Sequence, residues 1–316
     1  MYDNLSSIIN QPIKNMAIQA KVIKEKIKSV GNIKKITKTM EMVSVSKMRR
    51  AISDTLASRE YARYALELLV TLSKKRQIGH PLLLPGSGEK TLLVIVASNK
   101  GLCGGYNTNV SKLVSKFKKD HDREIEAVTI GKQAENIAHR NGLTIKASYK
   151  EFGEDIEIEK VKSLRKMIQK EFLESGEYNN VQIIYTQFVK QLDYRPKVRE
   201  IIPISPKTTR EIIEEVEHGS SDHRFSLDSL AQYLFEPTEE EVLNGVLPSL
   251  ISSVLFQILL EASASEHSSR MVAMQSASEN AEEMEEELTL TFNRARQAGI
   301  TQEISEIISG ASALQN

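Results

Sequence analysis

Apolar residues in the first part of the chain recur at helical spacing. Residues 17–73 contain no proline and one glycine, Gly31. Within them, four apolar residues lie three or four positions apart, namely Ile33, Ile36, Met40 and Val43. One helix of this length would span about 85 Å, whereas a compact domain of about 120 residues has a radius of gyration of about 14 Å. We therefore predict one long helix that protrudes from the globular part, because the alternative of shorter bundled helices lacks turn signals before residues 80–88.

The middle of the chain alternates between strand and helix patterns. Continuous apolar runs rich in β-branched residues predict buried strands at 91–97, 127–130 and 181–188. Helical patterns are found at residues 109–119, 132–140 and 158–174. Strands that alternate with helices predict a small α/β, Rossmann-like sheet domain over residues 88–205.

A second long helix is predicted at the C-terminal end. Residues 206–237 are read as an irregular connection, because much of this stretch is polar and lacks strong periodicity. Pro237, the capping candidate Thr238 and three following glutamates then indicate a helix start, and Pro248 is expected to interrupt or restart that helix. Apolar doublets recur every four residues through residues 242–259, so the apolar stripe winds around the helix.

The two long helices most economically bury their apolar stripes against each other. The predicted fold is thus a long antiparallel coiled coil of the N-terminal helix (16–80) and the C-terminal helix (238–316), joined to the small α/β domain. Each Leu or Ile side chain buried in that pair would contribute roughly 1.5–3 kcal/mol.

Charge is balanced overall but uneven along the chain. Lys and Arg total 42, as do Asp and Glu, so net charge gives no indication of nucleic-acid binding. Residues 16–50 hold ten basic and two acidic residues, whereas residues 279–287 hold six glutamates. We predict that the acidic run lies beside Lys24–Lys35 in the helix pair and helps to set its register. No apolar run approaches the roughly 20 residues needed to cross a bilayer, so membrane association is expected only through partners.

Candidate catalytic residues are few. The glycine-rich stretch Ser98–Asn107 follows a predicted strand, but it matches no phosphate-binding motif and is better explained as a tight turn. Cys103, the single cysteine, has no recognisable activating partner and excludes an intramolecular disulfide. His218 and His223 lie in a polar stretch without a metal-ligand pattern, and the neighbours Glu266 and His267 do not share a helix face. We therefore expect no catalytic site, no metal and no cofactor.

Three blocks of the chain resemble the gamma subunit of F-type ATP synthase. They are Ile36–Ala51 (ITKTMEMVSVSKMRRA), Ser98–Asn107 (SNKGLCGGYN), and Ala264–Met274 (ASEHSSRMVAM) together with Thr289–Leu314. Residues 277–281 also follow the family pattern, and the resemblance covers about residues 16–314 in the family's order. It implies a central shaft that turns inside a ring of three alpha and three beta subunits, with a globular foot on the membrane rotor.

The resemblance also implies roles for particular residues. Arg296, Gln297 and Thr301 match positions that contact a loop of the beta subunit, and Met40 and Arg270 match positions tied to coupling efficiency. The pair Phe235–Glu236 matches a segment near the ring of c subunits. Four apolar residues match the tip that turns in an apolar sleeve: Ile304, Ile307, Ile308 and Leu314. Without the resemblance, each of these would be read as a coiled-coil core residue or a solvated-face residue.

The implied function is that of a non-catalytic, rotating central-stalk subunit that couples ion flow to conformational change in the beta subunits. Its implied partners are the alpha, beta, epsilon and c-ring subunits, at the cytoplasmic face of a bacterial inner membrane or, alternatively, on the mitochondrial matrix side. Family members commonly begin near Met16, so residues 1–15 are an extension, whose order is left open, or reflect an upstream start codon.

Two rival interpretations remain at the level of sequence. One is a free-standing coiled-coil scaffold with an α/β recognition domain, which would self-associate without an enclosing ring. The other is an enzyme that uses the glycine-rich turn, which predicts nucleotide binding by the isolated chain. The cysteine pair of the photosynthetic gamma subunits is absent, so thiol switching of that kind is not expected.

Overall fold

A computed structural model describes residues 3–74, 80–150, 152, 156–204 and 238–314. At the helix ends it describes the backbone but not the side chains of residues 3–19, 56–74, 239–240 and 313–314. Contacts divide the chain into two compact units. The first consists of Met1–Val43 and Val272–Asn316, and the second of Ser44–Met271.

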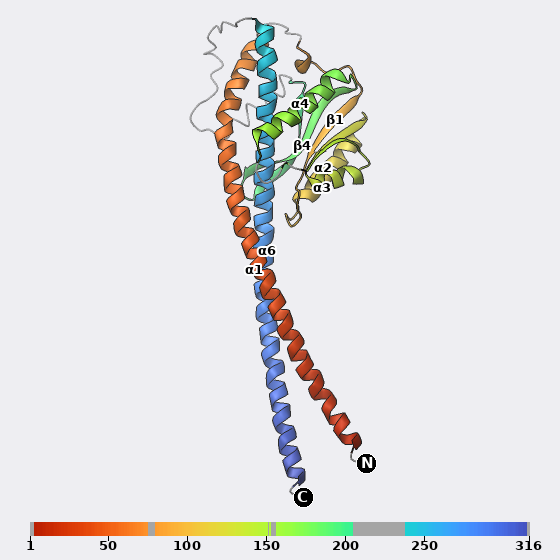
Figure 1. The fold of residues 1–316 in the computed structure, drawn as a ribbon, viewed down its shortest axis with the longest axis vertical. Coiled ribbons are helices and arrows are strands. Elements are labelled where there is room, and N and C mark those ends of the chain that lie inside the picture. Colours follow the sequence, from red (N-terminus) through yellow and green to blue (C-terminus); the bar gives the residue numbers. More distant parts are fainter. Residues whose placement is uncertain (1–2, 75–79, 151, 153–155, 205–237, 315–316) are drawn as a thin grey trace. The chain divides into compact units, whose positions relative to one another are not determined.

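Two long helices run through the chain, as predicted (Figure 1). Helix α1 spans Asp3–Lys74 and helix α6 spans Glu239–Leu314. Because α1 already begins at Asp3, residues 3–15 are part of this helix, and their assignment as an extension relative to the family stays a prediction. Their own sequence explains the helix, since apolar residues recur there at three- and four-residue spacing, as in the rest of α1.

Helix α6 begins where its capping signal predicted. The backbone N–H of Glu241 donates a hydrogen bond to Thr238 Oγ1 at 3.2 Å, which satisfies one of the free donors of the first turn. The expected interruption at Pro248 is wrong, because α6 continues through it. A proline inside a helix costs about 3 kcal/mol. Four fully or almost fully buried side chains around it each contribute roughly 1.5–3 kcal/mol: Leu243, Leu247, Leu250 and Ile251.

The cap provides a local test. We expect Thr238→Ala to destabilise the first turn of α6 by about 1 kcal/mol, because one helix N–H loses its acceptor. Amide hydrogen exchange over residues 239–242 measures this directly. The matched control is Ser249→Ala, since the Ser249 hydroxyl only donates to Gly245 O within the same helix. Equal exchange in both variants would show that Thr238 does not cap α6.

In the first unit, charged residues join α1 and α6 in antiparallel order. Lys34 Nζ lies 2.8 Å from Glu282 Oε1 and 3.6 Å from Glu285 Oε2, while Gly31 faces Glu285. The hydrogen bond to Glu282 is the main cause of the raised pKa of Lys34, and it lowers the pKa of Glu282. The predicted placement of the acidic run beside the lysine-rich segment is therefore confirmed at Lys34.

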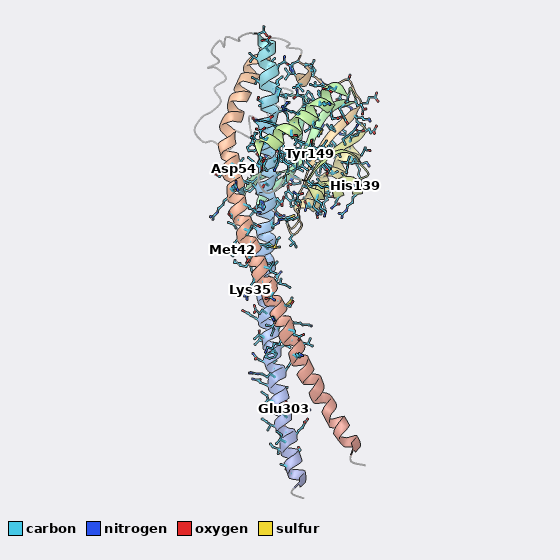
Figure 2. All side chains as sticks on the ribbon, in the orientation of Figure 1. Lys35, Met42, Asp54, His139, Tyr149 and Glu303 are labelled. Atoms are coloured by element: carbon cyan, nitrogen blue, oxygen red, sulfur yellow. The ribbon has the colours of Figure 1, made fainter. Side chains whose placement is uncertain are left out.

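The apolar stripe of α1, however, does not pack as predicted. Ile33, Ile36 and Val43 are 49, 60 and 47 % exposed. The small side chain of Thr37 is buried instead, and its hydroxyl is satisfied by the carbonyl of Ile33 at 3.0 Å. Met42, 57 % exposed, adds to the uncovered surface (Figure 2). The buried side of α1 thus includes Thr37 and, half-buried, Ile27 and Val30, while Ile33, Ile36 and Val43 lie on its exposed side.

The second unit contains a five-stranded sheet in the order β3-β2-β1-β4-β5. Its strands are β1 (Lys90–Val96), β2 (Ile125–Ile130), β3 (Thr144–Tyr149), β4 (Tyr178–Lys190) and β5 (Asp193–Ile202). Its shorter helices are η1 (Pro81–Leu83), α2 (Tyr106–Asp120), α3 (Lys132–Arg140) and α4 (Ile158–Glu174). Strands β1, β2, β3 and β4 pair in parallel, and β5 is antiparallel to β4. The α/β, Rossmann-like prediction is confirmed.

Two strands were missed by the sequence patterns, and both lie at the edges of the sheet. Strand β3 alternates exposed and half-buried residues, and β5 carries Pro196 and several charged residues. Edge strands tolerate proline and charge because one side needs no ladder partner. Their sequences therefore lack the continuous apolar run that revealed the buried strands.

Each face of the sheet has its own core. Along β1, Leu92, Val94 and Val96 pack with α4 and α6, whereas Leu93 and Ile95 pack with α2 and α3 on the other face (Figure 1).

Helix α6 corrects the expectation that no apolar stretch of the chain is long enough to cross a bilayer. By length and composition, residues Glu241–Ser312 contain a window apolar enough to cross a membrane, but 61 % of that window is buried within the protein. This is typical of a core helix.

A buried carboxylate lies near the amino ends of the central strands. Glu126 is 5 % exposed, and it accepts hydrogen bonds from Tyr178 Oη, from Lys90 Nζ at 3.0 Å and from Lys146 Nζ at 3.3 Å. Burial by itself raises the pKa of Glu126, but the bonds from Tyr178, Lys90 and Lys146 together lower it below the ordinary value of 4.5. The cluster joins four neighbouring strands through one side chain.

Candidate functional site

The last turns of α6 present a polar group followed by an apolar group. Arg296, Gln297 and Thr301 are exposed, and none of them has a hydrogen-bond partner among the side chains that the structure describes. Three exposed isoleucines follow: Ile304, Ile307 and Ile308, at 52, 71 and 60 %. At 100° per residue all six side chains fall within about 140° of one face. The structure therefore brings these predicted residues together along about 18 Å of one helix.

Exposed apolar residues on this face are unusual in a protein that needs no partner. Contiguous apolar surface on a soluble protein commonly marks a binding site, whereas single exposed side chains do not. The tip is also helical to Leu314, whose side chain lies outside the described part of the chain. This face of α6 has no chemical reactivity of its own. Its isoleucines can slide against an apolar surface, while its polar side chains can form hydrogen bonds next to that surface.

Met40 and Arg270 occupy different surroundings. Met40 lies on α1 in the first unit and is half-buried. Arg270 lies in the second unit and is only 7 % exposed. The prediction that both take part in coupling stays a prediction, and the burial of Arg270 leaves little of its surface for direct contact with a partner.

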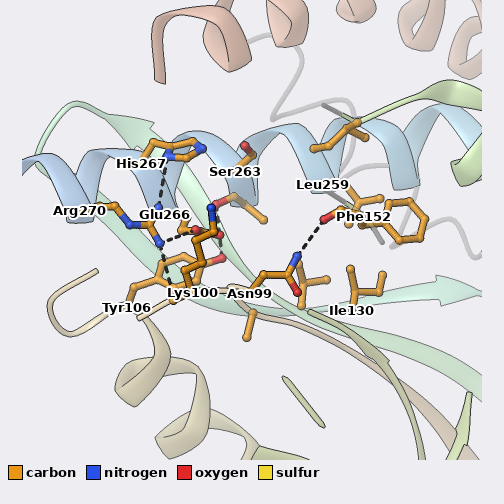
Figure 3. Close-up of a pocket in the computed structure, with 14 residues that line it drawn as sticks. Asn99, Lys100, Tyr106, Ile130, Phe152, Leu259, Ser263, Glu266, His267 and Arg270 are labelled. Carbon is orange, nitrogen blue, oxygen red and sulfur yellow. Dashed lines mark hydrogen bonds and ion pairs between the residues drawn. The ribbon is translucent and has the colours of Figure 1, made fainter. Parts of the chain in front are cut away.

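Those neighbours surround the Arg270 guanidinium (Figure 3). Its Nη2 lies 2.6 Å from Glu266 Oε1, and its Nη1 lies 3.3 Å from His267 Nδ1. It also reaches the carbonyls of Lys100 and Gly101 at 3.4 Å. The sequence analysis considered Glu266 and His267 only as neighbours that do not share a face, and it missed Arg270, which lies four residues after one and three after the other and contacts both. The i, i+4 spacing of Glu266 and Arg270 was the sequence signal for this cluster.

The glycine-rich stretch 98–107 is a tight turn, as predicted. The hydroxyl of Ser269 donates to Cys103 O at 2.7 Å, and the backbone N–H of Ser98 donates to Asn107 Oδ1 at 3.2 Å. Leu102 and Gly104 take left-handed φ values of 61° and 54°, a conformation that suits glycine better than leucine. The turn is thus held against α6 by Ser269 and Arg270.

No catalytic arrangement is found among the residues described. Cys103 is 2 % exposed, and its sulfur accepts from Asn107 Nδ2 at 3.1 Å, so it is a packed turn residue and not a reactive thiol. Within the described ranges, no three His, Cys, Asp or Glu side chains are placed to hold a metal ion. Phe235, Glu236, His218 and His223 lie outside those ranges, so the predicted c-ring contact is not tested.

Comparison with known proteins gives a consistent result over most of the chain. The sequence model described as ATP synthase matches residues 19–314. The ATP synthase gamma chain of Pelotomaculum thermopropionicum is 34% identical over 294 residues, covering 93% of this chain and 98% of its own length. The gamma chain of Desulfitobacterium hafniense is 35% identical over 298 residues, with 94% and 99% covered.

Solved structures agree with the fold. A central-stalk chain of the Tetrahymena thermophila mitochondrial ATP synthase matches with a TM-score of 0.55 and 25% identity, over 77% of this chain and 99% of that chain. A chain of the Euglena gracilis mitochondrial ATP synthase matches with a TM-score of 0.65, over 94% and 95%; at 17% identity it supports the fold alone.

These likenesses first define a class, the central-stalk subunits of rotary ATP synthases, whose long helices flank a small α/β domain. Within that class, the chain belongs to the ATP synthase gamma-chain family. It is therefore the rotating stalk subunit of a membrane-associated F-type ATP synthase, and the resemblance drawn from its motifs is confirmed. This family assignment favours neither the free-standing scaffold nor the independent enzyme.

Proposed function

We propose that this chain turns inside a ring of alpha and beta subunits without catalysing a reaction itself, and that its C-terminal face is the contact that distinguishes one beta subunit from the next. The observation that carries the proposal is the continuous exposed face of α6, with Arg296, Gln297 and Thr301 followed by three exposed isoleucines. A face of this composition fits an enclosing partner better than bulk water.

The two halves of the face have different physical roles. Ile304, Ile307 and Ile308 interact through dispersion and apolar burial, which depend weakly on direction, so the tip can rotate in an apolar sleeve without breaking strong bonds. The guanidinium of Arg296, the amide of Gln297 and the hydroxyl of Thr301 form directional hydrogen bonds. Their contact with a beta subunit therefore depends on the angle of the shaft.

An angle-dependent contact is sufficient to couple rotation to catalysis. If the shaft binds one conformation of a beta subunit more tightly than another, rotation changes which conformation is favoured, and the coupling is reciprocal. Changing a two-state population from 1:99 to 99:1 needs about 5.5 kcal/mol of differential interaction. Three polar contacts, together with buried apolar surface, can supply an energy of this size.

The exposed apolar face of α1 adds a second surface for the ring. Ile33, Ile36 and Val43 lie at coiled-coil spacing, yet they are exposed. Half-buried Met40 is in register with them. We assign this face to contact with the surrounding subunits, so Met40 influences coupling by positioning its exposed neighbours.

Arg270 has a positioning role in this scheme. Its guanidinium holds the glycine-rich turn through two backbone carbonyls and is itself oriented by Glu266. The turn then presents Leu102, which is 64 % exposed, to a partner.

The epsilon and c-ring subunits complete the partner set, with Phe235–Glu236 as the c-ring contact. Because the gamma chains compared above include bacterial ones, we place the complex at the cytoplasmic face of a bacterial inner membrane.

Co-purification tests the proposal. A tagged full-length chain expressed with its own alpha and beta subunits is expected to recover both in a single complex that hydrolyses ATP, whereas the chain alone hydrolyses none. The matched variant replaces Ile304, Ile307 and Ile308 with serine, and we expect it to recover less of the ring. A monodisperse chain that recovers neither subunit would contradict the proposal.

A further inference from the structure

A cavity of about 380 Å³ lies in the second unit between α4 and the first part of α6 (Figure 1). Helix α4 contributes Ile158, Lys162 and Arg165 to its wall, and α6 contributes side chains from Pro248 to Phe256. Ligand pockets commonly have volumes of about 300 Å³ or more, so this cavity can hold a small molecule. Among the described residues, its wall contains two cationic side chains and no acidic one, which favours an anionic ligand.

The guanidinium of Arg165 gives the strongest indication of a ligand. Its Nη1 donates to Gln169 Oε1 at 2.5 Å, and this is the one hydrogen bond that it makes with the described part of the chain. Its Nε is buried and has no hydrogen-bond partner there. Burial also lowers the pKa of Arg165 below its usual value. Because a buried donor without a partner destabilises a fold, this N–H group requires an acceptor from outside the chain.

The open edge of this guanidinium matches a carboxylate. The Nε and Nη2 groups lie on one edge of the planar side chain, and their parallel N–H bonds can meet both oxygens of one carboxylate. Gln169 occupies Nη1, so it leaves that edge open. Lys162 adds a second positive charge to the wall. Its Nζ lies 2.7 Å from Glu159 Oε1, but Glu159 is 74 % exposed and does not line the cavity.

The rest of the wall is suited to a small apolar body. Ile158, Pro248 and Phe256 supply apolar surface. The remaining part is formed by three serines, Ser249, Ser252 and Ser253. Each serine hydroxyl already donates to a carbonyl one turn earlier in α6, at 2.9 to 3.0 Å. These hydroxyls are satisfied within the helix, so a ligand needs no polar group besides its carboxylate.

We propose that this cavity binds a small monocarboxylate with an apolar body, such as benzoate. Its carboxylate accepts hydrogen bonds from Nε and Nη2 of Arg165, and its body packs against Phe256 and Pro248. A neutral head is disfavoured, because it gives the buried Nε–H no charged acceptor. This binding is separate from the rotor role, since the cavity lies in the second unit and away from the exposed C-terminal face of α6.

Fluorine NMR of 4-fluorobenzoate tests the ligand class on the full-length chain. We expect saturable binding of one molecule per chain, measured by broadening of the fluorine signal. The uncharged analogue 4-fluorobenzamide has nearly the same shape and is expected to bind at least about tenfold more weakly, because it loses the charge-assisted pair. Equal binding of the two compounds would overturn the proposed ligand class. An absence of saturable 4-fluorobenzoate binding would overturn the site itself and leave water as the partner of Arg165.

Two substitutions of Arg165 locate the site. Arg165→Gln removes the cation and is expected to weaken 4-fluorobenzoate binding at least about tenfold. Arg165→Lys keeps the charge but not the two parallel N–H groups, and it is expected to weaken binding about three- to tenfold. The matched control is Lys166→Gln, which removes one charge from an exposed residue of α4 outside the cavity wall and should change binding less than about twofold.

The variants separate a specific site from general attraction of anions. Equal weakening in Lys166→Gln and Arg165→Gln would show that the net charge of α4, and not the cavity, attracts the probe. Unchanged binding in Arg165→Gln would overturn the assignment as well. If Arg165→Gln fails to fold, Arg165→Lys decides, because it keeps a long cationic side chain at this position.

Discussion

Replacing Arg296, Gln297 and Thr301 together with alanine is expected to lower ATP synthesis by the assembled complex at least about tenfold. Each lost hydrogen bond removes about 0.5–3 kcal/mol, and 1.4 kcal/mol corresponds to a factor of ten. The three side chains are exposed and have no hydrogen-bond partner among the described side chains, so their removal costs the isolated chain little. Proton- or sodium-driven ATP synthesis in membrane vesicles measures the effect, with the amount of assembled complex determined in parallel.

The matched control replaces three polar residues that point away from this face. Gln302, Ser305 and Ser309 lie on the other side of α6, and their hydrogen bonds are made within their own helix. Their alanine variant is expected to synthesise ATP within about twofold of the wild type, since no partner contact is lost. If both triple variants lose activity equally, the exposed C-terminal face is not the coupling contact.

The sequence was sufficient to predict the elements whose signals are local. Both long helices, the buried strands and the cap at Thr238 were predictable, because hydrophobic periodicity and capping depend on near neighbours along the chain. The register at Lys34 was also predictable, because opposite charges were concentrated in two segments that the antiparallel arrangement places side by side.

Features set by tertiary packing were not predictable from the same patterns. Pro248 stays inside α6 because buried leucines outweigh its cost, and Ile33 and Ile36 are exposed because α1 buries a different side, which includes Thr37. The cluster around Arg270 was missed for a similar reason, since Lys100 and Gly101 approach it only in the folded unit. Apolar periodicity identifies which residues share a face, but not what covers that face.

Replacing Glu126 with alanine is expected to destabilise the sheet by about 3 kcal/mol, since Tyr178 loses its acceptor and two lysines lose a buried counter-charge. The value is at the low end for a buried pair, because Lys90 and Lys146 keep access to water. Amide hydrogen exchange of β1 and β2 is the appropriate measurement, since it reports on the sheet separately from the long helices. Protection there is expected to fall about 150-fold.

The same residue predicts a pH dependence. The folded-state pKa of Glu126 is lowered below its ordinary value of 4.5, so its contribution is present above pH 4.5 and is lost as pH falls through the folded-state pKa. The difference in protection between wild type and Glu126→Gln should therefore be largest at neutral pH and shrink in acid. Glu124→Gln is the control, because its carboxylate is 65 % exposed and lies 3.9 Å from Lys90. A pH-independent difference for Glu126→Gln would mean that packing, and not the ionised carboxylate, stabilises this end of the sheet.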